Sequence, residues 1–539
     1  MLAGLRTVGI QHGGCMTATQ LPERPNLEQL KRQAKDLLRS ARANESAALA
    51  RFRILPAFAD MSDVDLARRT LALHDAQSVI AREHGFDTWN ALRERVEELT
   101  LEFSAAVDHF IEAATDGRAD RAERLLARHP RIARANMYTA LLLGDAEMVE
   151  ARFAEHPEYA TERGGPRGWE PMHYACLTSV GARSDAREAG LVAIARRLIS
   201  LGADPNLRFP WLHHGVNRPI LWGAVCVVRS LRLAEVLLGA GADPSDGVTL
   251  PLAASGGDVA ALDLLLAHGA DVNRPWATDG STPLYAILHW AKTADGVRWL
   301  LAHGADPDPV FAENGETPLH VVAASWDRGL AEELVNRGAD VARRRADGRT
   351  PYAVAELNGN REVAAWLVAH GAPSELPAVD RLVAACSRGD RSAVDAMLEA
   401  QPDLPREIGP EHYGAFYRAA ERNDIPALDT MLACGFDPNR GDESIGKTAL
   451  HVAAMEGWPD AVRVLLAHGA SVTVRDREFK AQPLIWAAEG ARTSRNGRNH
   501  AAVGRLLLEA GSPVDWQQGE EPSEGILEIV NEWRGVHTE

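Results

Sequence analysis

A short phrase that recurs along most of the chain constrains the fold more than any other feature. In each copy an apolar run is followed by Gly, then usually by Ala and Asp, as in "VLLGAGADPS", "LLLAHGADVN" and "WLLAHGADPD". Successive copies lie 28 to 42 residues apart, with one gap of 64. A period of this size predicts a stack of similar units, each of which buries its apolar face against its neighbours.

The glycine of this phrase predicts where a helix ends. A chain that leaves a helix abruptly needs a positive φ just beyond the last turn, and glycine adopts that conformation without steric cost. We therefore expect these glycines to be structural, and the double gap to contain a divergent unit near residues 378–405. The predicted helix-ending glycines are Gly202, Gly241, Gly269, Gly304, Gly338, Gly371, Gly435, Gly469 and Gly511.

A second phrase precedes the first in many units, as in "GSTPLYAI", "GETPLHVVA", "GRTPYAVA" and "GKTALHVAA". Thr before Pro can cap a helix while the proline takes the first helical position, where its missing N–H costs nothing. One unit therefore reads as a turn, a short helix, a loop, a longer helix and a glycine stop. The predicted capping threonines are Thr282, Thr317, Thr350 and Thr448.

Together the two phrases, TPLHxA and LLxxGAD(V/P)N at a period of about 33 residues, resemble the ankyrin repeat. The resemblance implies a mainly α fold, an ankyrin-type solenoid of helix pairs joined by β-hairpin fingers, and protein binding as the usual role. It also implies that His173, His320 and His451, at the fourth position of the second phrase, hydrogen-bond the backbone between adjacent repeats.

The predicted array covers residues 103–519 in about a dozen units, of which the first two and the one near 378–405 are divergent. A cap helix is expected at 520–539 and a disordered tail at 1–20, with Met16 as an alternative start to Met1. Residues 21–102 predict a small all-α module, because apolar residues follow one helical face. This region is similar to the helical module that precedes ankyrin arrays in some bacterial proteins, a resemblance that implies no activity.

Charge and composition limit the partners. The chain carries 58 basic and 75 acidic residues, a formal charge of -17 that repels nucleic acid and anionic lipid. It offers no apolar run of about 18 residues to span a bilayer. Its five cysteines have no zinc-site spacing, which favours reduced, buried thiols. We therefore expect a cytoplasmic, monomeric protein with no cofactor, no metal site, no nucleic-acid partner and no membrane insertion.

One stretch raises the question of catalysis. "GDESIGKT", residues 441–448, matches the phosphate-binding loop pattern, in which Lys447 would contact phosphates and Thr448 magnesium. Such a loop follows a buried strand, whereas the preceding residues are "LACGFDPNR". The repeat itself already requires Gly446 and Thr448. We predict an ordinary finger with no catalytic residues, and an NTPase or nucleotide binder remains the alternative.

Candidate partner-binding residues lie in the predicted fingers and in one insertion. Large apolar side chains occur there, and each either anchors a partner or packs against the neighbouring finger. The insertion "EGARTSRNGRNHA" carries arginines that dock an acidic segment or form a solvated loop. The sequence thus predicts a non-enzymatic protein-binding scaffold; alternatively the N-terminal module binds its own ligand and the array targets it. The candidates are Phe209, Trp211, Trp276, Phe311, Arg492, Arg495 and Arg498.

Overall fold

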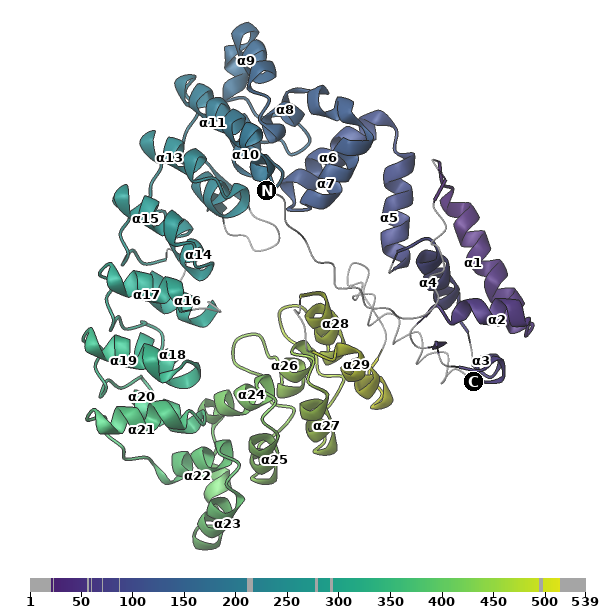
Figure 1. The fold of residues 1–539 in the computed structure, drawn as a ribbon. Helices are drawn as coiled ribbons and strands as arrows, with labels where there is room; N and C mark the ends of the chain where they lie inside the picture. The colour runs from purple at the N-terminus through teal and green to yellow at the C-terminus, as the bar shows by residue number, and fades with distance from the viewer. Residues whose placement is uncertain are drawn as a thin grey trace, which may run out of the picture. The chain divides into compact units, whose positions relative to one another are not determined.

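The computed structural model describes residues 21–513 except 23, 56–57, 60, 70, 87, 211–216, 277–279, 291–293 and 494–497. Two compact units result: residues 102–442 form one, and residues 1–101 with 443–539 form the other. The predicted tail at 1–20 and cap helix at 520–539 lie outside the described residues. The structure confirms the predicted fold class, since it is mainly helical and built from stacked helix pairs (Figure 1).

The described part of unit 102–442 contains ten helix pairs. In Figure 1 the first helices of the pairs, such as α14, α16 and α18, lie on the inner side of this unit, and their partners α15, α17 and α19 lie on the outer side. Its elements are α6 (Phe103–Thr115), α7 (Ala119–Arg128), η2 (Pro130–Arg134), α8 (Met137–Leu143), α9 (Ala146–Glu155), η3 (Pro157–Ala160), α10 (Pro171–Cys176), η4 (Gly181–Arg183), α11 (Asp185–Ser200), β1 (Arg208–Pro210), β2 (Asn217–Pro219), α12 (Ile220–Trp222), the π-helix η6 (Gly223–Val228), α13 (Leu231–Gly239), α14 (Thr249–Ser255), α15 (Val259–Ala267), α16 (Pro283–Trp290), α17 (Asp295–Ala302), α18 (Pro318–Ser325), α19 (Arg328–Asn336), α20 (Pro351–Leu357), α21 (Arg361–Ala369), α22 (Ala378–Ser387), α23 (Arg391–Ala400), η7 (Leu404–Glu407), η8 (Pro410–His412), α24 (Tyr413–Glu421) and α25 (Ile425–Ala433).

The pair α18–α19 shows why the sequence folds in this way. Thr317 caps α18, with proline at the first position, and Asp327 caps α19 by accepting a hydrogen bond from the Leu330 amide at 3.0 Å. Helix α19 ends at Gly338, whose φ is 108°. Apart from the half-buried Val335, the apolar side chains of both helices are buried between neighbouring pairs, so each unit contributes one slice of a continuous core.

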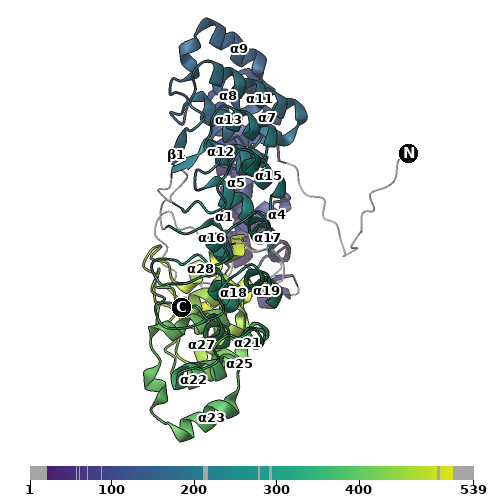
Figure 2. The ribbon, with the colours of Figure 1, turned by 90° about the vertical axis from the view of Figure 1, so that its left-hand side faces the viewer.

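The fingers between pairs are mostly tight turns rather than strands. Among the described residues only β1 and β2 pair as strands, antiparallel, with Phe209 opposite Arg218. Figure 2 shows β1 at one edge of the stack. Another finger closes through the Phe311 amide, which donates to the Glu316 carbonyl at 2.8 Å. The predicted hairpins therefore shorten to single hydrogen-bonded turns in most units.

Asparagines at the start of the fingers connect successive units. The Asn206 side chain donates to the Gly241 carbonyl at 2.9 Å and accepts from the Asp243 amide at 2.8 Å. Asn273 repeats both contacts one unit later, with the Gly304 carbonyl at 3.0 Å and the amide of Asp306 at 2.8 Å. The last residue of the phrase "GADPN" thus satisfies backbone groups that the helix end leaves without partners.

Residues 21–101 contain five helices with an apolar core of their own. Leu30, Ala34, Leu37 and Ala41 of the first helix are buried in that core. The first helix packs against the fourth. Arg51 and Glu83 form an ion pair across the module through two hydrogen bonds, both at 2.7 Å. The helices are α1 (Leu27–Arg42), α2 (Ser46–Phe52), α3 (Asp63–Ala67), α4 (Leu73–Glu83) and α5 (Trp89–Thr100).

Residues 443–513 contain two further helix pairs, in which α26 and α28 pack together and α27 packs against α29. Across the described residues of the whole chain, no helix has both the length and the apolarity that crossing a bilayer requires. The helices of this segment are α26 (Ala449–Met455), α27 (Pro459–Ala467), α28 (Pro483–Thr493) and α29 (His500–Glu509).

Candidate functional site

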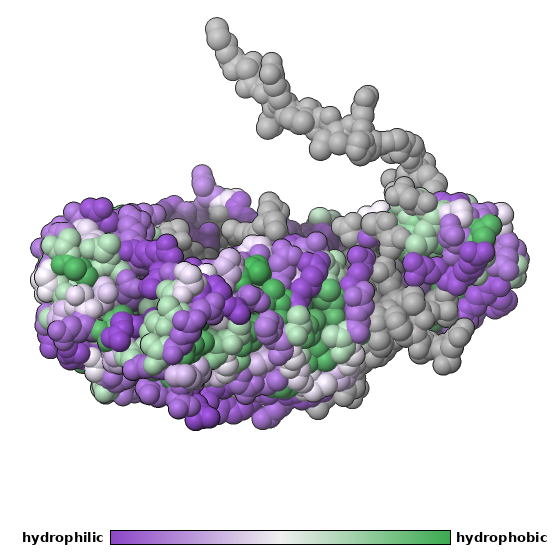
Figure 3. Space-filling model, turned by 90° about the horizontal axis from the view of Figure 1, so that it is seen from below, coloured by the Kyte–Doolittle hydropathy of each residue, from purple (hydrophilic) through white to green (hydrophobic). Residues whose placement is uncertain are grey.

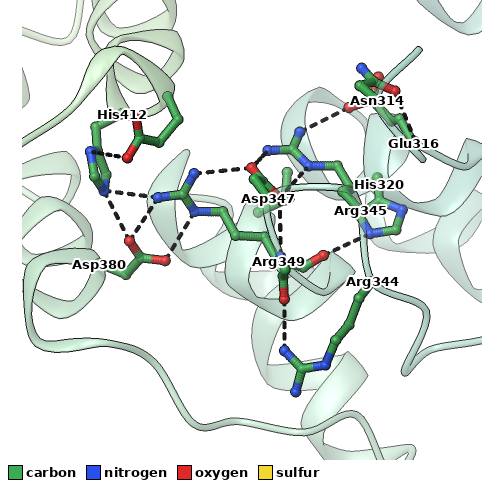
Figure 4. Close-up of polar contacts among 12 residues, drawn as sticks. Asn314, Glu316, His320, Arg344, Arg345, Asp347, Arg349, Asp380 and His412 are labelled. Atoms are coloured by element: carbon green, nitrogen blue, oxygen red, sulfur yellow. Dashed lines mark hydrogen bonds and ion pairs between the residues drawn. The ribbon is translucent and has the colours of Figure 1, made fainter.

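A buried histidine joins one repeat to the next. The Thr317 amide donates to His320 Nδ1 at 3.2 Å, so Nδ1 carries no proton, and Nε2–H donates to the Arg349 carbonyl at 3.2 Å (Figure 4). His320 is 0% exposed, and this burial lowers its pKa to about 4. The imidazole is therefore neutral, and both its nitrogens are used in structural hydrogen bonds.

The equivalent histidines repeat the Nε2 contact, and His451 repeats the Nδ1 contact as well. His451 Nδ1 lies 2.8 Å from the Thr448 hydroxyl, and His451 Nε2 lies 3.1 Å from the Ala481 carbonyl. His173 Nε2 lies 3.3 Å from the Arg208 carbonyl, and burial lowers the pKa of His173. None of the three imidazoles points into a shared cavity, so their geometry is that of links between repeats.

The other two capping threonines accept hydrogen bonds from their own helices. Thr350 accepts from the Ala353 amide at 3.3 Å, and Thr282 accepts from the Tyr285 amide at 3.4 Å. The nine glycines of the first phrase all have positive φ, between 83° at Gly469 and 108° at Gly338. They are Gly202, Gly241, Gly269, Gly304, Gly338, Gly371, Gly435, Gly469 and Gly511.

A buried ionic cluster joins three successive units and was not predicted. Arg349 Nε and Nη2 bind the two carboxylate oxygens of Asp380 at 3.0 and 2.8 Å, and Figure 4 shows His412 beside both side chains, with its Nε2 2.8 Å from Arg349 Nη2. The Gly409 amide donates to His412 Nδ1 at 2.9 Å, so Nε2–H donates to Asp380 Oδ1 at 3.0 Å. Burial alone would raise the pKa of Asp380, but the hydrogen bonds from His412 and Arg349 lower it to about 2.

The position of these residues explains how the divergent unit is held. Asp380 is the third residue of its helix and His412 the third of η8, the slot that His320 occupies in α18. The signal in the sequence is "GPEH", a variant of the second phrase with glycine at the cap. Where the histidine-to-backbone link is missing, an ion pair between side chains takes its place.

The finger aromatics divide into one buried and two half-exposed side chains, and Trp211 lies outside the described residues. Phe209 is only 1% exposed and packs at about 6 Å between ring centroids against Trp169 and Trp222. Phe209 therefore follows the packing alternative, because β1 turns it toward the first helices, and it offers no surface to a partner. Trp276 and Phe311 are half-exposed at the tips of adjacent fingers.

Among the described finger residues of unit 102–442, the most exposed large apolar side chain lies on the finger that carries Phe311. Val310 is 52% exposed, and Phe311 beside it stacks on Tyr285 with ring centroids 4.8 Å apart and planes at 14°. The Tyr285 hydroxyl donates to Glu316 Oε2 at 2.9 Å. Glu316 Oε1 in turn accepts from Arg345 Nη1 of the next finger at 3.0 Å. This finger is thus held firmly while Val310 stays at the surface.

The insertion between α28 and α29 is described only at its end. Arg495 and the side chain of Arg492 lie outside the described residues. Arg498 pairs with the Glu456 carboxylate, donates to the Glu456 carbonyl at 2.9 Å and lies 4.3 Å over the Trp458 ring. Its charge is therefore used within the chain.

The segment that matches the phosphate-binding loop is a finger. Among the described residues no strand precedes it, and residues 434–448 form turns and irregular chain. Thr448 is 1% exposed and its hydroxyl lies 2.8 Å from His451 Nδ1, so it caps a helix of seven residues. Elsewhere in the described part, no three His, Cys, Asp or Glu side chains gather as a metal would require.

A model of the family described as "Ankyrin repeats (3 copies)" matches the chain at residues 288–377, 382–476 and 416–518. Human "Ankyrin repeat and SOCS box protein 6" is 39% identical over 75 residues, 14% of this chain and 18% of that protein. Mouse "Rabankyrin-5" is 29% identical over 161 residues, 28% of this chain and 13% of that protein. The chain thus spans less than a fifth of either relative.

A third relative is matched over most of its length. Human "Cyclin-dependent kinase inhibitor 2A" is 31% identical over 144 residues, which are 24% of this chain and 90% of that protein. The segments that the family model matches, 288–377, 382–476 and 416–518, contain the helix pairs and glycine stops described above.

Proposed function

Because the chain belongs to the ankyrin repeat family, we propose that it is a non-enzymatic scaffold that binds a protein partner through its fingers and first helices. Ankyrin repeats are typical of protein–protein interaction, and the fold fixes an architecture rather than a partner. The choice of surface therefore has to rest on particular side chains.

The observation that carries the proposal is the row of apolar side chains on two adjacent fingers. Trp276 and Phe311 occupy the same register, since each amide donates across its finger at 2.8 Å, to Ser281 and Glu316. Val310, 52% exposed, stands next to Phe311. On the face drawn in Figure 3, hydrophobic residues form small groups among hydrophilic ones. Exposed apolar groups rimmed by polar residues are common features of protein interfaces.

A pair of valines tests the choice of surface. Val310→Asp places a charge on the finger, and Val368→Asp places the same charge on the outer helix α21, where Val368 is 41% exposed. We expect affinity capture followed by mass spectrometry to lose the wild-type partner with Val310→Asp and to keep it with Val368→Asp. Equal retention by both variants would show that the fingers of this region are not the binding surface.

The proposal extends to a monomeric, cytoplasmic protein. Support for the cytoplasmic part of this proposal comes from Cys176, Cys386 and Cys434, which are buried free thiols. Burial raises the pKa of Cys176 to about 12, so this thiol is held in its unreactive, protonated form. The NTPase alternative gains no support from the finger at 441–448, because Thr448 already serves as a helix cap.

A further inference from the structure

Helix α24 lies against first helices that are far from it in the sequence. Arg422, at its C-terminal end, donates from Nη2 to the Ala324 carbonyl of α18 at 3.1 Å and from Nη1 to the Asn358 carbonyl, just after α20, at 3.3 Å. Ala324 precedes Arg422 by 98 residues. The inner face of unit 102–442 therefore brings α24 close to the fingers that precede α18 and α20.

Arg418 lies one turn before Arg422 on α24 and is half-buried on this inner face. Its charged neighbours are Glu421 and Arg422 on its own helix, and Glu316 and Arg345 on two fingers. It also acts electrostatically on His289 of α16, whose side chain is 41% exposed. Despite these neighbours, Arg418 makes no hydrogen bond or ion pair with any residue that the structure describes.

Two carboxylates lie near Arg418, Glu421 on its own helix and Glu316 on a finger, and that of Glu316 is already occupied. Glu316 accepts from the Tyr285 hydroxyl at 2.9 Å with one oxygen and from Arg345 at 3.0 Å with the other. Arg345 is further bound by Asp347 at 2.5 Å. Arg418 is therefore the member of this group whose guanidinium donors remain unused.

A half-buried guanidinium without acceptors is energetically unfavourable. It has given up part of its hydration, and no hydrogen bond replaces what was lost. Burial lowers the pKa of Arg418, and the charges of Glu421 and Glu316, which raise it, do not compensate. An acceptor supplied from outside would relieve this cost, and a carboxylate matches the planar fork of a guanidinium with two parallel hydrogen bonds.

We propose that Arg418 receives a carboxylate side chain from an acidic segment of the protein partner. The inner face beside α24 is then the polar part of a binding surface whose apolar part is the finger of Val310 and Phe311. This inference rests on the proposed function, and it adds the chemical class of the partner. Because the whole chain carries a charge of -17, recognition of an acidic segment requires such a local cation.

The test uses the full chain and two fluorescein-labelled peptides with amidated C-termini, hexaglutamate and hexaglutamine. Fluorescence anisotropy at low ionic strength, where charge interactions are least screened, measures both affinities. We expect the full chain to bind hexaglutamate at least about tenfold more tightly than hexaglutamine. Arg418→Gln should remove about tenfold of the hexaglutamate affinity, a loss of about 1.4 kcal/mol, while Arg418→Lys should lose less.

Arg196→Gln is the matched control, because Arg196 is an exposed guanidinium on the outer helix α11 and its loss changes the net charge equally. Thermal melting checks that all variants are folded. The proposal is overturned if hexaglutamate does not bind, if Arg418→Gln binds as the wild type does, or if Arg196→Gln weakens binding equally. If Arg418→Gln still captures the partner that Val310→Asp loses, the carboxylate proposal fails while the scaffold function stands.

Discussion

At the scale of single residues, the neutral histidine of the second phrase couples the fold to pH. His320 is unprotonated in the folded state because both its nitrogens are committed, Nδ1 as an acceptor and Nε2–H as a donor. Its pKa of about 4 lies below the ordinary value of 6.5. The unfolded chain therefore takes up a proton at a higher pH than the folded chain does, so protonation favours unfolding.

The direction in which stability changes with pH follows from these two pKa values. The contribution of His320 is fully present above about pH 6.5 and is lost progressively as the pH falls toward about 4. Between about pH 7.5 and about pH 6, this single group should reduce the free energy of unfolding by about 1 kcal/mol. Urea denaturation of the wild type and of His320→Gln, which keeps a donor but does not titrate, measures the contribution of His320 to the free energy of unfolding. Identical pH slopes for the two proteins would contradict the assignment.

Single residues also mark what the sequence could and could not predict. The helix caps and glycine stops are local, because each depends on neighbours within a few positions, and the phrase contains them all. The cluster of Arg349, Asp380 and His412 joins side chains up to 63 residues apart, and no local sequence pattern predicts it. The sequence leaves Phe209 open between anchoring a partner and packing, because it shows an aromatic in a finger but not the direction in which β1 turns it.

At the scale of the helix, the glycine stop is an energetic requirement that can be isolated. Gly269 has a φ of 89°, and a methyl group added there meets no atom within 4 Å. Gly239 also has open space around it, but it lies inside α13 and its φ is not positive. The two positions differ in backbone conformation, not in crowding.

Alanine substitution should therefore have opposite effects at these positions. Gly269→Ala should lower stability by about 1 to 2 kcal/mol, because the methyl group penalises a left-handed backbone. Gly239→Ala should raise it by up to about 1 kcal/mol, because alanine favours the helix more than glycine does. The urea midpoints of the two variants, compared with that of the wild type, show whether the effects on stability are opposite. Equal destabilisation would mean that the positive φ does not select glycine at the stop.

Elements other than the glycine stops depart from the simplest repeat. The fingers are turns in most units because two backbone hydrogen bonds, as those between the Phe311 amide and Glu316 and between the Gly315 amide and Phe311, already close them. The finger that does form strands, β1 with β2, is the one with the longer sequence between its flanking helices. The length of a finger can be predicted from the sequence, whereas the hydrogen bonds within a short turn depend on how the neighbouring fingers pack against it.

At the scale of the whole molecule, we propose different tasks for the two kinds of surface: outer helices such as α17 and α21 stabilise the stack, and the fingers and first helices bind the partner. Residues 21–101 have a separate apolar core, which keeps open the alternative that this module binds a ligand of its own.

Hydrogen–deuterium exchange of the full chain, with and without its captured partner, tests the central claim most directly, because it reports protection segment by segment. We predict that the partner slows exchange in the finger at 308–317 and in α24, and leaves α17, α19 and α21 unchanged. Protection confined to those outer helices, or to residues 21–101, would contradict the assignment of the binding surface.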